Sequence, residues 1–79
     1  MKDIRYTSAA ASDLRKYRSL AKRLTAKLER YAQTGAGDVT QLVGSAARRL
    51  REGDFRIIFV ESETEILVTK IAPRGHIYE

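Results

Sequence analysis

The apolar residues of the N-terminal half recur at intervals of three and four positions. The series is Leu14, Tyr17, Ala21, Leu24, Leu28 and Tyr31. Because an α-helix turns once every 3.6 residues, side chains at these intervals form one stripe along its surface. The pattern therefore predicts an amphipathic helical region, either one long helix or two helices that meet near Arg18 and Ser19.

Local signals indicate where this helical region begins and ends. Ser8 or Ser12 can cap its start, because a serine hydroxyl accepts a hydrogen bond from a free N–H group of the first turn. Ser19 could cap a second helix in the same way. Gly35 is expected to end the region, because glycine readily adopts the left-handed conformation that closes many helices.

The rest of the chain alternates between apolar and polar positions, which is typical of strands. We expect strands at residues 4–7, 46–51, 55–61 and 65–71. The last three are separated by short polar turns, so they predict an antiparallel meander, with residues 76–78 as a further short strand or tail. The loop before the meander contains Val39, Leu42 and Val43, which we expect to attach it to the core.

Segregation of helices and strands along a chain predicts the α+β class, here a small antiparallel sheet with one or two N-terminal helices on one face. Successive side chains of a strand point to opposite faces of the sheet, so alternate residues share a face. Phe55, Ile57 and Phe59 should face the helices, whereas Arg56 should lie on the open face. Likewise Arg49 and Arg51 should share one face, and Arg48 and Leu50 the other. The sequence therefore predicts an open sheet face that carries arginines.

The length and composition of the chain indicate a small domain and argue against several classes of site. Seventy-nine residues predict one small domain over 1–79 with a modest core. The chain has no cysteine and one histidine, so we expect no disulfide, no metal site and no cofactor. The longest apolar run, residues 57–60, is too short to span a membrane. We expect a cytoplasmic protein.

Charge points to a polyanionic partner. The formal net charge is +5, and the helical segment 13–30 carries seven basic residues against two acidic ones. Solvated helix faces often carry such charges, but a second group of arginines follows at 48–56. Two basic groups on a small domain favour nucleic acid. The helical residues expected to contact RNA are Lys22, Arg23, Lys27 and Arg30.

Several segments together resemble the RelE/ParE superfamily of toxins from bacterial type II toxin–antitoxin systems. They are IRYT at 4–7, DVTQLVG at 38–44, RLREGDFRIIF at 49–59 and IAPRGHIY at 71–78. The resemblance runs over nearly the whole chain and implies the RelE-like fold, which is similar to that of microbial ribonucleases. It also implies a small antitoxin as partner, in a hetero-oligomer.

The RelE branch implies metal-independent cleavage of mRNA on the ribosome. A base takes the proton of the ribose 2′-OH, whose oxygen attacks the adjacent phosphate, and fixed cations stabilise the added charge of the phosphorane. An acid then protonates the 5′-oxygen, which leaves as its bond to phosphorus breaks. By position, Arg56 matches the arginine that clamps the scissile phosphate, and Arg74 a second stabilising arginine. Tyr78 matches the tyrosine that stacks on or activates the substrate. Arg49 and Arg51 would contact RNA.

The sequence departs from RelE enzymes at two strand positions. Where those enzymes carry lysines, this chain has Ala47 and Arg49. Arginine stays protonated, so proton transfer would fall to His76, which can titrate near neutral pH. Two alternatives stay open. The chain could resemble the ParE branch, which inhibits DNA gyrase, or a degenerate toxin that acts only as an antitoxin-binding co-repressor.

The substitution of His76 by glutamine tests this assignment. If His76 transfers a proton, RNA cleavage by the natural chain has a limb in its pH profile in the neutral range, where imidazole titrates. His76→Gln should remove the limb and lower the cleavage rate by about two to four orders of magnitude. Tyr78→Phe, which keeps the ring and loses the hydroxyl, separates stacking from proton transfer. An unchanged rate and profile in His76→Gln would exclude the histidine.

Overall fold

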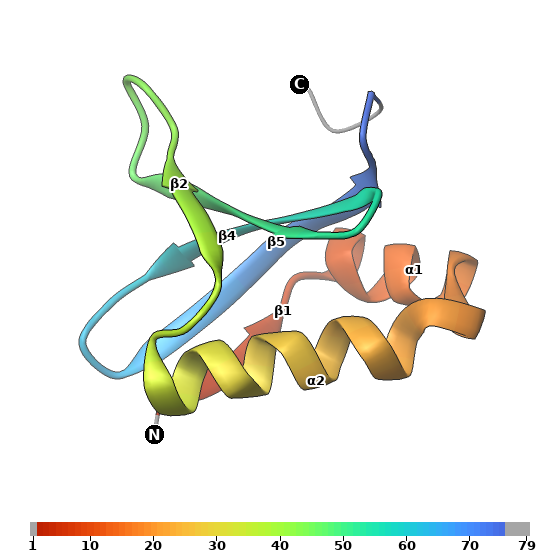
Figure 1. Ribbon diagram of the computed structural model, residues 1–79, viewed down its shortest axis with the longest axis horizontal. Coiled ribbons are helices and arrows are strands. Elements are labelled where there is room, and N and C mark those ends of the chain that lie inside the picture. The colour runs from red at the N-terminus through yellow and green to blue at the C-terminus, as the bar shows by residue number, and fades with distance from the viewer. Residues whose placement is uncertain (1, 76–79) are drawn as a thin grey trace.

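The computed structural model describes residues 2–75, which form a five-stranded sheet with two helices against one face (Figure 1). The strands are β1 (Asp3–Tyr6), β2 (Asp38–Gln41), β3 (Ala47–Glu52), β4 (Phe55–Glu61) and β5 (Glu65–Pro73). Their order in the sheet is β1-β5-β4-β3-β2. β1 pairs with β5 in parallel, and the other three pairs are antiparallel. The α+β prediction is confirmed.

The helical region is divided into α1 (Ser8–Lys16) and α2 (Arg18–Thr34), with Tyr17 between them. The predicted serine caps are wrong. Thr7 is in an extended conformation at the end of β1, and its Oγ1 accepts a hydrogen bond from the Ala10 N–H at 3.1 Å. α2 has no side-chain cap, because Tyr17 precedes it and Ser19 lies inside it. The predicted end is confirmed, since Gly35 has φ +74°.

The segment before the meander differs from the expected loop. Residues 38–41 form the edge strand β2, paired with residues 48–51 of β3. Val39 packs against the core, as expected. Val43, however, is fully exposed, so its predicted contact with the core is wrong. It lies in the turn between β2 and β3, where the chain has left the sheet face that α2 covers.

The core lies between the sheet and α2. Leu24 and Leu28 of α2 are fully buried against Leu50, Ile57 and Phe59 of the sheet. The prediction that Ile57 and Phe59 of β4 face the helices is therefore confirmed. Truncating a fully buried leucine to alanine typically costs about 2–5 kcal/mol, a large fraction of the stability of so small a protein. The sheet therefore has one face committed to the core and one face free.

A polar cluster around Glu61 of β4 lies at one edge of this core. The Glu61 carboxylate accepts hydrogen bonds from Tyr31 Oη at 2.7 Å and Lys2 Nζ at 2.6 Å, and it pairs with Arg48 at 3.3 Å. Burial alone would raise the pKa of the Glu61 carboxyl, but the bonds from Lys2 and Tyr31 and the nearby positive charges lower it. Burial, together with the bond to Glu61, raises the pKa of the Tyr31 hydroxyl, which therefore remains a donor.

The lowered pKa of Glu61 makes the stability of the protein depend on pH. A carboxyl whose pKa is lower in the folded state stabilises the protein above its unfolded-state pKa, and this stabilisation is lost as pH falls through the folded-state value. Natural protein and Glu61→Gln should therefore differ most in free energy of unfolding near neutral pH and converge in acid. Glu63→Gln, an exposed neighbour, is the control. Urea unfolding from pH 7 to pH 3 measures this, and a pH-independent difference would contradict it.

Candidate functional site

The open face of the sheet gathers three arginines from two neighbouring strands. Arg51 of β3 lies directly opposite Arg56 of β4, and Arg49 is one pair further along β3, opposite Ile58. The adjoining residues of β2 are Asp38, opposite Arg51, and Thr40, opposite Arg49. These five side chains line a pocket of about 160 Å³, here called the arginine pocket: Asp38, Thr40, Arg49, Arg51 and Arg56.

Arg56 is held in place by the turn that precedes its strand. Its Nη1 donates to the carbonyl oxygens of Gly53 and Phe55, both at 3.0 Å. The residue is consequently only 9% exposed, although it lies on the open face. A guanidinium has five N–H donors in a fixed plane, so the bonds of Nη1 orient the remaining donors without consuming them. Among residues 2–75, no carboxylate lies within ion-pair distance of Arg56.

The arginine pocket has an excess of positive charge. Like charges directly opposite each other on a sheet are destabilising, as for Arg51 and Arg56. Asp38 offsets part of this with an ion pair to Arg51, but at 3.9 Å and with both side chains more than half exposed the pair is weak. Three arginines and one aspartate leave a net excess of two positive charges. A bound anion would relieve this repulsion, and arginine donors fit the geometry of a phosphate.

Arg74 is attached to the same turn as Arg56. It follows β5, its side chain is exposed, and its backbone N–H donates to the carbonyl of Asp54 at 2.6 Å. Asp54 lies between Gly53 and Phe55, the two residues that hold Arg56. The structure thus brings Arg56 and Arg74, which are far apart in the sequence, to one turn. His76 and Tyr78, the other two candidates, lie outside the described residues.

The four basic residues expected on α2 divide into two pairs. Arg23 and Lys27 form ion pairs with Glu52 at the end of β3, at 3.2 and 3.7 Å. Lys22 and Arg30 are exposed, and neither forms an ion pair within residues 2–75. α2 covers the other face of the sheet, so none of these four side chains joins the arginine pocket (Figure 1).

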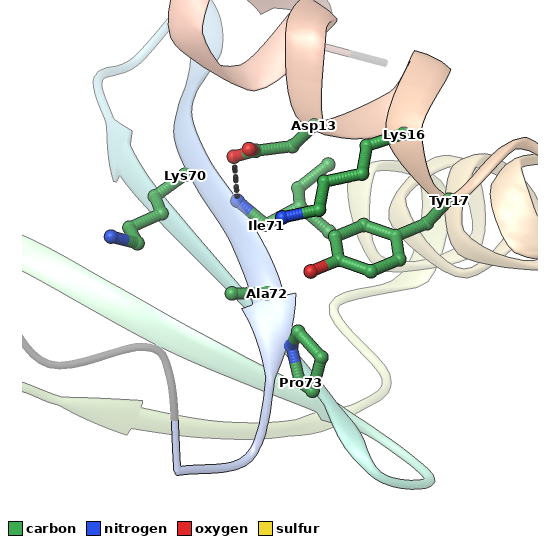
Figure 2. Close-up of a pocket in the computed structure, with 7 residues that line it drawn as sticks. All are labelled: Asp13, Lys16, Tyr17, Lys70, Ile71, Ala72 and Pro73. Carbon is green, nitrogen blue, oxygen red and sulfur yellow. Dashed lines mark hydrogen bonds between the residues drawn. The ribbon is translucent and has the colours of Figure 1, made fainter.

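A second pocket, not anticipated from the sequence, lies at the edge of β5. It has a volume of about 330 Å³ and is lined by Asp13, Lys16 and Tyr17 at the end of α1 and by residues 70–73 of β5 (Figure 2). We call it the β5-edge pocket.

The sequence analysis also did not identify Asp38 and Thr40 of the arginine pocket, because residues 38–41 were expected to form a loop.

Two classes of site receive no support from the described chain. Within residues 2–75 no three histidine or acidic side chains are grouped so that they could hold a metal ion. No helix in this part of the chain is long and apolar enough to cross a membrane.

The fold is similar to that of several solved toxin structures. A YafQ mutant from E. coli has a TM-score of 0.78 at 13% identity, over all of both chains. The RelB–RelE antitoxin–toxin complex from Methanococcus jannaschii gives 0.75 at 19% identity, over 94% of both chains. The RelE–RelB complex from Pyrococcus horikoshii gives 0.61 at 23% identity, over 95% of this chain and 97% of that one. No family model and no curated protein matches the sequence. The RelE-like fold expected from the sequence is confirmed.

The two pairs of basic residues on α2 should differ in their effects on RNA binding and on stability. Lys22→Gln/Arg30→Gln should weaken binding of a single-stranded RNA and reduce its salt dependence, by a slope of about 0.7 for each phosphate that is no longer neutralised, with little effect on stability. Arg23→Gln/Lys27→Gln removes the same charge but also the ion pairs to Glu52, so it should lower the midpoint of thermal unfolding as well. Binding titrations at several salt concentrations and thermal unfolding distinguish the pairs. An unchanged salt slope in both variants would make this helix face a solubilising surface only.

Proposed function

We propose that this protein is a RelE-type toxin, a metal-independent endoribonuclease that cleaves mRNA on the ribosome and is neutralised by a protein antitoxin. The observation that carries the proposal is the arginine pocket, in which Arg49, Arg51 and Arg56 converge on the open face of a RelE-like sheet. The fold alone would not specify this activity, because one fold can host many functions. The cluster of arginines adds a site whose chemistry fits a phosphodiester.

The arrangement fits the charge that develops during cleavage. When the 2′-oxygen attacks the phosphate, a pentacoordinate phosphorane forms with additional negative charge. Donors that are already oriented stabilise this charge without reorganising. Arg56 meets that condition, because its Nη1 is fixed by two carbonyl groups and its other N–H groups remain available. Arg49 and Arg51 would hold the flanking backbone, and Arg74 would approach from the turn.

The phosphorane then collapses as the bond from phosphorus to the 5′-oxygen breaks. The 2′-OH must lose a proton and the leaving 5′-oxygen must gain one, and these transfers require groups other than the arginines. Ala47 and Arg49 occupy the positions at which RelE enzymes carry lysines, and arginine does not exchange protons near neutral pH. We assign the transfer to His76 and Tyr78, which follow Arg74 by two and four residues. The bond from the Arg74 N–H to Asp54 holds the start of this C-terminal segment at the turn that also holds Arg56.

An antitoxin is the second partner that we propose. Two of the similar structures are described as complexes of RelE with RelB, one of them named an antitoxin–toxin complex. The basic surface of this chain would attract an acidic, flexible segment that folds on binding. Such a segment would compete with RNA for the open face. The protein would act in the cytoplasm, where ribosomes are.

The Arg56→Ala variant tests the assignment of the phosphate clamp. Removing one charge-stabilising donor should cost about 2–4 kcal/mol of transition-state stabilisation, a fall in rate of about 30- to 900-fold. The measurement is cleavage of a defined mRNA during in vitro translation. Ribosome-dependent cuts by the natural chain support the proposal. Gyrase-linked DNA breaks would instead favour a ParE-type target. If the natural chain causes neither kind of break, the result would favour a degenerate toxin.

A control for folding is needed, because Arg56 also binds the turn. Its removal leaves the carbonyl groups of Gly53 and Phe55 without this partner, which should lower the free energy of unfolding by about 1–3 kcal/mol. Arg56→Lys keeps the charge, so it should recover more of the stability than of the rate, since lysine lacks the planar donor pattern. Full cleavage by a folded Arg56→Ala protein would remove this residue from the mechanism.

A further inference from the structure

The β5-edge pocket exists because β1 stops pairing halfway along β5. The parallel register ends at Tyr6 and Val68, and after the Thr7 N–H bonds to Val68 the chain turns into α1. The next part of β5, residues 70–73, therefore has no strand on that side. Instead the end of α1 covers it, and the Asp13 carboxylate accepts the hydrogen bond of the Ile71 N–H at 2.9 Å (Figure 2). A side chain thus accepts the hydrogen bond that a neighbouring strand would otherwise accept at this edge.

The polar groups around this pocket favour an anion. Lys16 and Lys70 form no ion pair within residues 2–75, and the only carboxylate of the lining, Asp13, is already bonded to the backbone. In Figure 2, Lys16 and Tyr17 reach from the helical side towards β5, whereas Lys70 extends from the strand in the opposite direction. The volume of about 330 Å³ is within the range of small-ligand pockets.

One aromatic and one cationic neighbour hold the Tyr17 ring at the wall of this pocket, where its hydroxyl can contact an anion. Its ring meets that of Phe55 edge-on with the centroids 4.9 Å apart, and the Lys16 ammonium lies 5.4 Å from its ring centroid. The Tyr17 hydroxyl has no hydrogen-bond partner in the described part of the chain. The ring is fixed, its O–H group is an available donor, and the Lys16 ammonium lies on the same side of β5 (Figure 2). Hydroxyl and ammonium groups are suitable donors for phosphate oxygens.

The β5-edge pocket lies one strand away from the arginine pocket, although no residue lines both. Ala72, one of its lining residues, is paired in register with Arg56, and Lys70 is paired with Ile58. Because both flank the core residue Ile71, they lie on the open face with Arg56. Neighbouring strands are about 5 Å apart, so the second pocket begins one strand spacing from Arg56. A chain that crosses the strands of the open face would pass from one pocket to the other.

We propose that the β5-edge pocket binds a backbone phosphate of single-stranded RNA, in a nucleotide that flanks the scissile phosphate held by the arginine pocket. Lys16, Lys70 and the Tyr17 hydroxyl are the donors. This inference rests on the proposed function, because it takes the arginine pocket as the site of the scissile phosphate. It adds a second contact that fixes the direction in which RNA crosses the sheet.

The test is equilibrium binding of a 2′-O-methylated single-stranded RNA oligonucleotide, which cannot be cleaved, over a series of salt concentrations. Lys16→Gln/Lys70→Gln should weaken binding about tenfold at low salt and reduce the salt slope by about 0.7, the value for one phosphate of a single strand. Tyr17→Phe, which keeps the ring against Phe55, should weaken binding by a smaller factor. Thermal unfolding verifies that both variants are folded.

The matched control is Arg15→Gln/Arg18→Gln. These two exposed arginines flank Lys16 and Tyr17, do not line the pocket, and carry the same total charge as the two lysines. Natural affinity and slope in the lysine variant, or an equal loss in the control, would overturn the proposal. So would loss of binding to the antitoxin with RNA binding retained, because the pocket would then serve a protein.

Failure of this inference and failure of the proposed function give different results. If the natural chain binds the RNA and Arg56→Ala weakens binding whereas Lys16→Gln/Lys70→Gln does not, only the second phosphate contact is wrong. If the natural chain neither binds the RNA nor cleaves mRNA on the ribosome, the proposed function is wrong and this inference with it.

Discussion

The covering of one sheet face only is the constraint on which the rest of this molecule depends. A chain of 79 residues has too little apolar surface for two cores. α2 and α1 cover one face, where Leu50, Ile57 and Phe59 are fully buried. The alternation of strand residues then leaves every second side chain of β3 and β4 on the other face. Arginines can occupy those positions because no apolar layer packs on them.

The turn between β3 and β4 connects this open face with the helical layer. Glu52, just before the turn, pairs with Arg23 and Lys27 of α2. Gly53 and Phe55 accept the bonds of Arg56, and Asp54 accepts the N–H of Arg74. Gly53 has φ +58°, a conformation that glycine adopts without strain. One short turn therefore holds the side chain of Arg56 and the backbone of Arg74.

The sequence predicts those features of the fold that depend on local spacing. The helical stripe, the left-handed Gly35 and the faces of Phe55 and Arg56 follow from periodicity and turn chemistry, and the structure confirms them. The strand β2 was missed, because four residues with one apolar position carry little periodicity and become a strand only by pairing with β3. Asp38 and Thr40 were missed with it. Lys70 was missed because its place opposite Ile58, on the same face as Arg56, depends on the register of β4 and β5, which skips Thr69.

The distribution of ion pairs separates structural cations from those available to a ligand. Glu52 and Glu61 lie on the side of the helices, and together they engage Lys2, Arg23, Lys27 and Arg48. Among the residues that line the arginine pocket and the β5-edge pocket, Asp38 is the one carboxylate in ion-pair contact within residues 2–75, and its partner is Arg51. Arg49, Arg56, Lys16 and Lys70 consequently retain their charge without an acidic partner in this part of the chain. A net charge of +5 understates the field over these two pockets, because most of the acidic residues that reduce it act elsewhere. An extended polyanion laid across the open face would meet Arg49, Arg56 and Lys70 on three successive strands, and Lys16 lies at the far edge of the last strand.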